Sequence, residues 1–171
     1  ALLPGAIGHV EAHGTGTSLG DPIETSAVHA ALRGSGALAS SGYPLLLGAL
    51  KSAMGHLEGA AGVAGLLKAA MVLLDGGMPS NAHLARLNPH VSPSTRSNGV
   101  ALPQQRTQLA EGRQRAGVSA FGFGGSNAHA VLESPCGQPA LPPPLKTTAH
   151  LLRKATSSAP RARSLPWRWR A

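Results

Sequence analysis

The chain has 171 residues, of which 42% are apolar and only 3% aromatic, with a net charge of +8 at pH 7 when histidine is uncharged. This composition suffices for one modest domain, whose core depends on close backbone approach at abundant glycine and alanine rather than on large rings. The single cysteine, Cys136, excludes an internal disulfide and a cysteine-rich metal site. Its proline and glycine neighbours indicate a linker rather than a nucleophile.

The apolar segments are too short to cross a membrane. The longest covers residues 60–74 and is interrupted by Lys68, whereas a membrane-spanning helix needs ~20 residues. No charged segment followed by a long apolar run opens the chain, so no signal peptide is expected. We expect a soluble protein of the cytoplasm, or of an organelle such as a plastid, with no membrane partner.

The positive charge is concentrated near the C-terminus. Residues 1–133 contain eight Lys or Arg and seven Asp or Glu, whereas residues 134–171 contain seven Lys or Arg and no acidic residue. We predict a folded domain over residues 1–133 and a proline-rich, largely disordered basic tail over residues 134–171, with a short helix near residues 149–155. Binding of nucleic acid or a membrane through these cations, with Trp167 and Trp169, is the alternative; we favour a solvated tail.

Strand and helix patterns alternate in the first half of the chain. A strand over residues 7–12 leads through a glycine-rich turn to a helix that begins at a capping Asp21 and ends near Leu32. A continuously apolar strand over residues 45–50 has the composition of a central buried strand. A turn follows over residues 51–55.

The next helix, predicted from about residue 57 to residue 74, is apolar on nearly every face and rich in small residues. Such a helix is expected to be buried between two layers. Asp75, Gly76 and Gly77 end it. An irregular crossing over residues 78–99 precedes three strands near residues 100–102, 116–120 and 128–133, and the whole alternation indicates an α/β fold.

Three segments share one design, in which an apolar strand ends and a glycine-rich or reactive stretch begins. They cover residues 13–17, 51–56 and 121–127. Because ligands of layered α/β folds gather outside the carboxyl ends of the strands, we expect these segments to converge.

The first segment, HGTGT, sets the His13 imidazole beside the hydroxyl groups of Thr15 and Thr17, which can donate to amide or phosphate oxygens. A tight turn with a structural histidine is the alternative. Gly20 comes one residue too late for a dinucleotide-binding fingerprint.

The second segment places Lys51 five residues before His56, at the start of the predicted buried helix. The positive end of a helix favours an uncharged imidazole and stabilises a developing anion. A solvated lysine and a capping histidine are the alternative.

The third segment carries Phe121, Phe123 and Gly124. Its backbone N–H groups can stabilise an oxyanion while its rings gate an apolar channel, with an ordinary turn and core phenylalanines as the alternative. We interpret Asn127 and His129 as structural links.

The histidine spacing does not favour a metal site. His13 and the remote segment His56-x-Glu58 do not form the i, i+4 histidine pair of a zinc protease, and no cysteine joins them. The remaining histidines have no motif context, and we expect core or surface roles for His9, His29, His83, His90 and His150.

Together these segments resemble the ketosynthase domains of type I polyketide synthases and the condensing enzymes of fatty-acid synthesis. The first histidine motif corresponds to VEAHGTGT (residues 10–17) with GDPIE (20–24). The second corresponds to GALKS (48–52) with GHLEGAAG (55–62), and the closing motif to VSAFGFGGSNAH (118–129).

The resemblance implies a thiolase-like fold, in which this chain forms the second of two pseudo-equivalent halves, with a mixed β-sheet, a buried central helix and flanking helices. It also implies an acyltransferase of the 3-oxoacyl-[acyl-carrier-protein] synthase type, which performs a decarboxylative Claisen condensation. The implied partners are an acyl carrier protein, an N-terminal ketosynthase half and a second copy in a homodimer. No cofactor is bound directly, because the carrier protein supplies the phosphopantetheine.

The motif match assigns His13 and His56 to enolate stabilisation and decarboxylation, and Lys51 to the electrostatics of the site. Two further roles are implied. Thr15 and Thr17 bind pantetheine amides, and the Phe123 N–H shares the oxyanion hole within a gating loop that contains Phe121 and Gly124.

Two departures from the family pattern matter. The nucleophilic cysteine belongs to the N-terminal half, and Cys136, after the last motif, cannot replace it. Ala53 stands where the family usually has asparagine, which predicts a loosened loop or altered activity. We expect half of an active ketosynthase that is inactive alone; the alternative is a non-catalytic remnant that docks a carrier protein or partner subunit.

Overall fold

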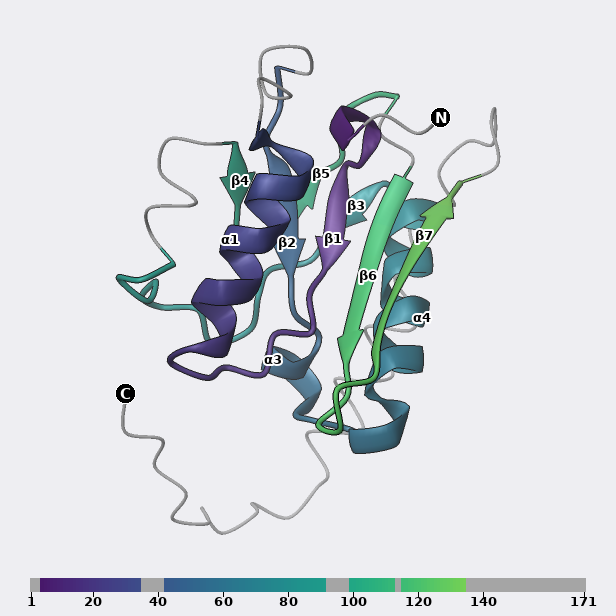
Figure 1. Ribbon diagram of the computed structural model, residues 1–171. Helices are drawn as coiled ribbons and strands as arrows, with labels where there is room; N and C mark the ends of the chain where they lie inside the picture. The colour runs from purple at the N-terminus through teal and green to yellow at the C-terminus, as the bar shows by residue number, and fades with distance from the viewer. Residues whose placement is uncertain (1–3, 35–41, 92–98, 113–114, 135–171) are drawn as a thin grey trace, which may run out of the picture. The chain divides into compact units, whose positions relative to one another are not determined.

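A five-stranded sheet lies between a helix on one face and a helix with a small second sheet on the other (Figure 1). This computed structural model describes residues 4–34, 42–91, 99–112 and 115–134, all within one unit of the chain, Ala1–Leu141. Cys136, both tail tryptophans and the predicted tail helix lie outside the described residues, so the domain boundary after residue 133 stays a prediction.

The large sheet has the strand order β4-β2-β1-β6-β7. The first four of these strands run parallel, and β7 pairs antiparallel with β6. Their bounds are β1 His9–Glu11, β2 Leu45–Gly48, β4 Val100–Ala101, β6 Arg115–Phe121 and β7 Asn127–Glu133. All five coincide with strands predicted from the sequence, and the mixed α/β character is confirmed.

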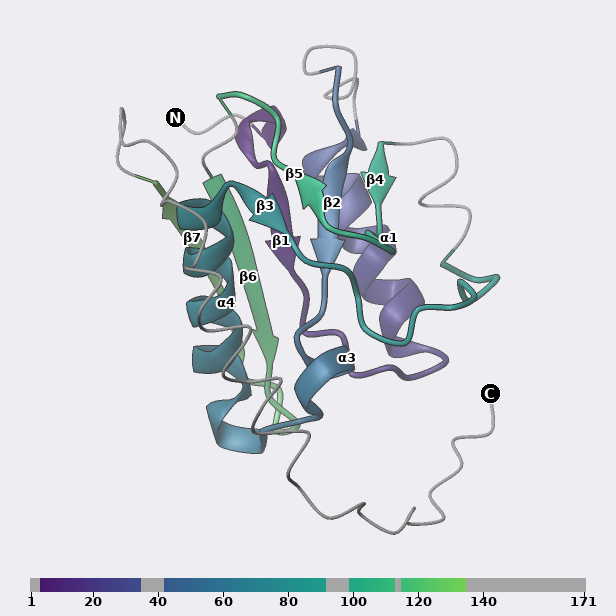
Figure 2. The ribbon, with the colours of Figure 1, turned by 180° about the vertical axis from the view of Figure 1, so that it is seen from behind.

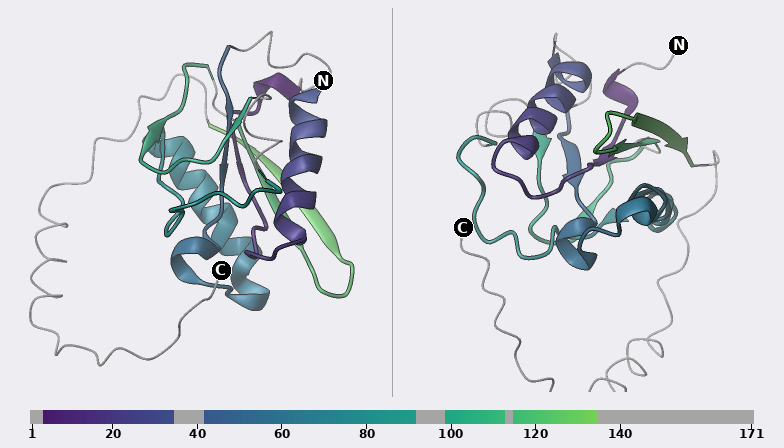
Figure 3. Two further views of the ribbon diagram at one scale, coloured as in Figure 1. Left: turned by 90° about the vertical axis from the view of Figure 1, so that its left-hand side faces the viewer. Right: turned by 60° about the horizontal axis from the view of Figure 1, so that its bottom comes forward.

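Apolar residues on both faces of the central strands explain the layering. Helix α1 (Gly20–Leu32) covers one face, where Val10, Leu45 and Leu47 are buried against it. Helix α4 (Ala61–Asp75) covers the other face, where Ala69 packs against Ala116. Figure 3, left, shows the sheet between the two helices.

A second sheet was missed by the sequence analysis. Strands β3 (Gly77–Met78) and β5 (Thr107–Gln108) pair antiparallel beside α4, on the face seen in Figure 2. Gly76, in the left-handed conformation, ends α4 and turns the chain directly into β3. Strands of two residues are too short to show the alternation of apolar and polar residues by which a strand is recognised in a sequence.

The helix predicted over residues 57–74 begins later than expected. A 3₁₀ turn, η3 (Glu58–Ala60), precedes α4. The predicted turn over residues 51–55 is a one-turn helix, α3 (Lys51–Met54), which Gly55 closes. The predicted cap at Asp21 is wrong, because α1 begins at Gly20, and the Asp21 carboxylate instead accepts the Gly16 N–H at 3.1 Å.

Within the described part of the chain, the helix predicted to lie between two layers is covered on one side only. Gly65, Ala69 and Val72 are buried, but the opposite side of α4 is open, with Leu67 61% and Met71 68% exposed. The described residues contain nothing that packs on this apolar side.

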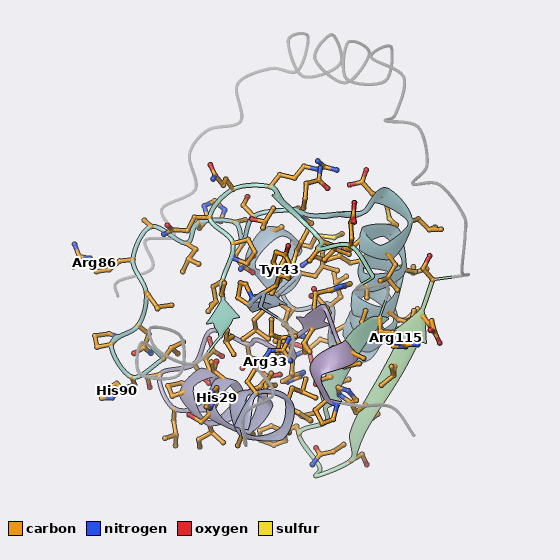
Figure 4. All side chains as sticks on the ribbon, turned by 90° about the horizontal axis from the view of Figure 1, so that it is seen from above. His29, Arg33, Tyr43, Arg86, His90 and Arg115 are labelled. Carbon is orange, nitrogen blue, oxygen red and sulfur yellow. The ribbon has the colours of Figure 1, made fainter. Side chains whose placement is uncertain are left out.

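The edge of the sheet at the amino ends of the parallel strands is closed by Arg33, at the C-terminal end of α1. This buried guanidinium donates to the Ile7 carbonyl at 3.0 Å and lies between α1 and the 3₁₀ turn η1 (Pro4–Ala6), as seen from above in Figure 4. In the described ranges, no helix is both long and apolar enough to cross a membrane.

Candidate active site at the carboxyl ends of the central strands

Three loops meet at one edge of the sheet because β1, β2 and β6 are adjacent and parallel (Figure 3, right). His13 follows β1, Lys51 and His56 follow β2, and the glycine loop follows β6. The His13 and His56 rings are arranged edge to face, with centroids 5.9 Å apart. The structure therefore brings the two histidine segments together.

The backbone at His13 is held by a carboxylate from α1. Glu24 accepts the His13 N–H at 2.8 Å and the Gly14 N–H at 2.9 Å. Gly14 has a φ of 49°, and a Cβ atom there would lie 2.6 Å from the Cβ of Ala49. Glycine is therefore required where the first loop crosses the start of the second.

The ring of His13 has one defined tautomer when it is neutral. Its Nδ1 accepts the backbone N–H of Phe121, the last residue of β6, at 3.3 Å. A ring nitrogen that accepts carries no proton, so the proton lies on Nε2. His13 is thus a hydrogen-bond donor at Nε2.

His56 has the same arrangement with a different partner. Its Nδ1 accepts the backbone N–H of Glu58 at 2.9 Å, which again places the proton on Nε2. Glu58 adopts a φ of 48°, a left-handed conformation that residues other than glycine seldom adopt. This turn directs the Glu58 N–H towards His56.

The charges around His13 favour its neutral form. Burial lowers the pKa of His13, and the positive charge of Lys51 lowers it further, with a smaller contribution from His56. The carboxylates of Glu24 and Asp21 raise the pKa of His13, but its pKa stays below the usual value. At neutral pH His13 is therefore an uncharged donor.

Lys51 is half-buried at the start of α3 and lines a small pocket together with Glu11 and Ser119. Burial lowers the pKa of Lys51, while Glu11 and Glu24 raise it. The two carboxylates thus help to keep the ammonium group charged beside His13.

The glycine loop meets the histidines only at its first residue. The Phe121 ring lies 5.4 Å from the His13 ring, centroid to centroid. Phe123 and Gly124 lie at the exposed tip of the loop, where the Phe123 side chain contacts neither histidine. Two backbone hydrogen bonds close the turn: the Gly122 N–H donates to the Ser126 carbonyl, and the Gly125 N–H donates to the Gly122 carbonyl. The Phe123 N–H takes part in neither bond.

The two threonines lie on the exposed part of the first loop. The Thr17 Oγ accepts the Gly20 N–H at 3.0 Å, so its own proton is available for donation. Thr15 is likewise exposed.

The α3 segment is held without an asparagine at position 53. The Ser52 hydroxyl donates to the Ala49 carbonyl at 2.7 Å and accepts the Ala82 N–H at 3.0 Å. Ala53 is exposed, and these Ser52 bonds argue against the loosened loop expected from its sequence.

Sequence reasoning missed Glu11 and Glu24 as parts of the site. Glu11 is 2% exposed and pairs with Lys68 of α4 at 2.6 Å. An acidic residue inside an apolar strand is the signal that was available, since buried carboxylates nearly always have partners. His129 forms the expected structural link, at 3.0 Å from the Ser119 hydroxyl.

Comparison with known families gives two matches. Residues 1–85 match the model of the beta-ketoacyl synthase C-terminal domain, and residues 88–165 match the ketoacyl-synthetase C-terminal extension. A highly reducing polyketide synthase, azaB, of Aspergillus niger is 47% identical over 134 residues, which are 78% of this chain and 5% of that protein. Erythronolide synthase EryA2 of Saccharopolyspora erythraea is also 47% identical, over 77% of this chain and 4% of its own length.

Solved structures agree with these relatives. The oxazolomycin ketosynthase domain OzmH KS7 of Streptomyces albus superposes with a TM-score of 0.69 and 39% identity, over 80% of this chain and 23% of that chain. Ketosynthase twelve of the bacillaene polyketide synthase of Bacillus amyloliquefaciens gives a TM-score of 0.65 and 35% identity, over 81% and 24%. The chain thus spans less than a tenth of the curated relatives and about a quarter of these ketosynthase structures. It belongs to the β-ketoacyl synthase family, where it corresponds to the C-terminal part of a polyketide synthase ketosynthase domain with a thiolase-like α/β fold.

Proposed function

We propose that this chain supplies the histidine and lysine half of a ketosynthase active site, which performs decarboxylative condensation once an N-terminal half supplies the nucleophilic cysteine. One observation carries the proposal: two imidazoles 5.9 Å apart each accept a backbone N–H at Nδ1, which leaves two Nε2–H donors. Paired neutral donors suit a reaction in which negative charge develops on one oxygen.

The proposed reaction starts with an acyl chain held as a thioester on the cysteine of the N-terminal half. A malonyl-type thioester on an acyl carrier protein loses CO2 when the bond to its carboxylate breaks, and the electron pair forms an enolate. His13 and His56 donate hydrogen bonds to the enolate oxygen. The enolate carbon then attacks the acyl thioester, the new C–C bond forms, and the cysteine thiolate leaves.

The positive charge of Lys51 favours an anion beside the two histidines. Its charge lowers the pKa of His13, so the ring stays neutral and donates a hydrogen bond rather than its proton. The ammonium group also adds a positive charge near the forming enolate.

The exposed residues of the loops are assigned to substrate contacts. Thr15 and Thr17 bind the pantetheine amides of the carrier protein, and the Thr17 hydroxyl has a proton to donate. The Phe123 N–H contributes to the oxyanion hole, in a loop that gates the site through Phe121 and Gly124. The chain itself holds no other cofactor in this proposal.

The N-terminal half is proposed to cover the open apolar side of α4. Exposed apolar side chains recur at helical spacing along it, namely Val63, Leu66, Leu67, Met71 and Leu74. A continuous apolar face of this kind is covered in a stable assembly. The chain spans about a quarter of the ketosynthase structures that it resembles, so the remaining part of such a domain is large enough to cover the face. The intact enzyme is proposed to be a homodimer.

Co-production with an N-terminal ketosynthase segment that contains the cysteine motif tests the function. We expect the assembly to release CO2 from a malonyl thioester and to extend an acyl chain by two carbons. The isolated chain should bind no acyl group, because it lacks the thiolate. Acyl loading of the isolated chain, detected by mass spectrometry, would contradict the proposal. A stable but inactive assembly would identify a non-catalytic docking subunit instead.

A further inference from the structure

We propose that Asn81 is a positioning residue of this site. Its side-chain amide takes the place of a peptide group beside the carboxyl end of β2, and it thereby fixes the backbone that leads into α3 and Lys51. The catalytic meaning of this inference rests on the proposed function, whereas the contacts are properties of the chain itself.

The pairing of β2 with β4 cannot continue to the carboxyl end of β2. The Leu45 N–H donates to the Gly99 carbonyl at 2.6 Å, and the same parallel pattern, two residues further on, would bring the N–H of residue 103 to the Leu47 carbonyl. Residue 103 is proline, which has no N–H. The Leu47 carbonyl therefore needs a donor from elsewhere in the chain.

The side chain of Asn81 supplies this donor. Its Nδ2 donates to the Leu47 carbonyl at 3.1 Å, and its Oδ1 accepts the Ala49 N–H at 2.9 Å. A further residue of a parallel strand would make the same two bonds with its backbone. The Asn81 amide thus extends the hydrogen bonding of the sheet past the end of β4, at the point where the chain leaves β2 for Lys51.

The backbone around Asn81 is held in turn by its neighbours. The Asn81 N–H donates to the Pro103 carbonyl at 2.8 Å. The N–H of the next residue, Ala82, donates to the Ser52 hydroxyl, which itself donates to the Ala49 carbonyl at 2.7 Å. Both backbone groups of Ala49 are therefore fixed, its N–H by Asn81 and its carbonyl by Ser52.

Ala49 connects this contact with both histidine loops. It lies two residues before Lys51, and a Cβ atom at Gly14, next to His13, would lie 2.6 Å from the Ala49 Cβ. A displacement of Ala49 would therefore move the start of α3 and the Lys51 ammonium group with it. We infer that Asn81 acts on the site through Lys51.

Two substitutions separate the donor of Asn81 from its acceptor. Asn81→Leu keeps the branched shape of the side chain and removes both bonds. Asn81→Asp keeps an oxygen for the Ala49 N–H but directs a second oxygen at the Leu47 carbonyl, which cannot donate. The matched control is Asn88→Asp in the same connection between β3 and β4, where Oδ1 accepts the His90 N–H at 2.9 Å and a carboxylate can do the same.

Amide hydrogen exchange in the full 171-residue chain tests the contact without any need for activity. We expect Asn81→Leu to accelerate exchange at Ala49 by about tenfold, with β6 unchanged. Asn81→Asp should accelerate it by about threefold, and Asn88→Asp should leave it unchanged. Unchanged exchange at Ala49 in either folded Asn81 variant overturns the inference. Unfolding of both variants also overturns it, because the role that we propose is local.

Activity in the assembled ketosynthase tests the catalytic consequence. We expect Asn81→Leu to lower decarboxylation by roughly tenfold, since a small misplacement of a group in the site is costly. Acyl loading onto the cysteine of the N-terminal half should stay within about twofold. An equal loss in both steps overturns the inference, because it would show a general effect on the structure.

The pH dependence of decarboxylation reports the position of Lys51. Burial lowers the pKa of His13, Lys51 and His56 lower it further, and the Glu24 and Asp21 carboxylates raise it. An ammonium group that is no longer held beside His13 lowers this pKa less, so Asn81→Leu should move the acid limb of the rate profile, measured between about pH 5 and pH 8, to higher pH. An acid limb that stays in place in the folded variant overturns the inference.

A double variant with Lys51→Met tests whether Asn81 acts through Lys51. In the Lys51→Met background, Asn81→Leu should change decarboxylation by no more than about twofold, because the two substitutions affect one interaction. A full tenfold loss in that background, about the same as without Lys51→Met, overturns the inference. If the unsubstituted assembly does not decarboxylate, the proposed function fails, while the exchange experiment still decides whether Asn81 holds Ala49.

Discussion

The imidazole of His13 meets the edge of the His56 imidazole at a centroid distance of 5.9 Å, although the two residues follow different strands. Each ring is held at Nδ1 by a backbone N–H, from Phe121 and from Glu58 respectively. The fold therefore fixes the orientation of both histidines through main-chain donors.

Replacement of either histidine by alanine should remove one donor to the enolate. We expect His13→Ala and His56→Ala each to lower decarboxylation of a malonyl thioester in the assembled ketosynthase by ~100-fold or more, as loss of one oxyanion donor does elsewhere. Acyl loading, which does not form the enolate, should be retained. Full decarboxylation by His13→Ala would remove that residue from the mechanism.

Lys51→Met should shift the pH dependence of decarboxylation. The positive charge of Lys51 lowers the pKa of His13, so its removal raises that pKa towards the usual value. His13 then becomes protonated at a higher pH, and the acid limb of the rate profile, measured between about pH 5 and pH 8, moves to higher pH. Arg86→Met, which removes an exposed cation, should leave the limb in place. A shift to lower pH after Lys51→Met contradicts the account.

His9 should make the fold sensitive to acid. The ring is 1% exposed on β1, its two nitrogens have no hydrogen-bond partner among the described residues, and burial followed by the charge of Lys68 lowers its pKa to about 4. The unfolded chain, with a pKa near 6.5, binds the proton more tightly, so stability is present above that pH and falls as pH drops to about 4. The loss amounts to at most about 3 kcal/mol.

Urea unfolding at several pH values measures this effect. His9→Phe should flatten the stability profile between about pH 6.5 and pH 4 and stabilise the chain at neutral pH, because two unpartnered polar atoms are removed. The exposed His90→Phe should leave the profile unaltered. An equally steep profile in His9→Phe would show that other groups determine it.

The open side of α4 should be required for assembly and not for the fold of this chain. Leu67→Lys should leave the circular dichroism and unfolding of the isolated chain unchanged, because the side chain is already 61% exposed. It should prevent association with the N-terminal segment, since a charge would be buried at the centre of an apolar interface. Ile23→Lys, equally exposed on α1, is the control and should assemble normally. Normal assembly of Leu67→Lys would place the interface elsewhere.

The sequence predicted those parts of the fold that have long, one-sided or continuously apolar patterns. Strands β1, β2 and β6 and helix α1 were located within a few residues, because buried strands and a helix between two glycine-rich segments leave clear signals. Strands β3 and β5 were missed since two residues show no period. The open side of α4 could not be located from the sequence, because apolar residues on nearly every face do not indicate which side packs on the sheet.

For the site, the segments were visible in the sequence but their connections were not. Reactive residues after apolar strands indicated a common edge, and parallel strand order brings them there. The link from the Phe121 N–H to His13, and the two contacts that Glu24 makes from a neighbouring helix, depend on tertiary geometry. No spacing rule in the sequence encodes them.

The tautomers of the two histidines test the central claim most directly. Nitrogen-15 NMR of the full chain at neutral pH, with His13→Gln and His56→Gln to assign the signals, measures which ring nitrogen carries the proton. We predict that both rings are protonated at Nε2 and accept a hydrogen bond at Nδ1. A proton on Nδ1 of either ring would contradict the account, because that ring could not accept its backbone N–H and present Nε2–H to an enolate.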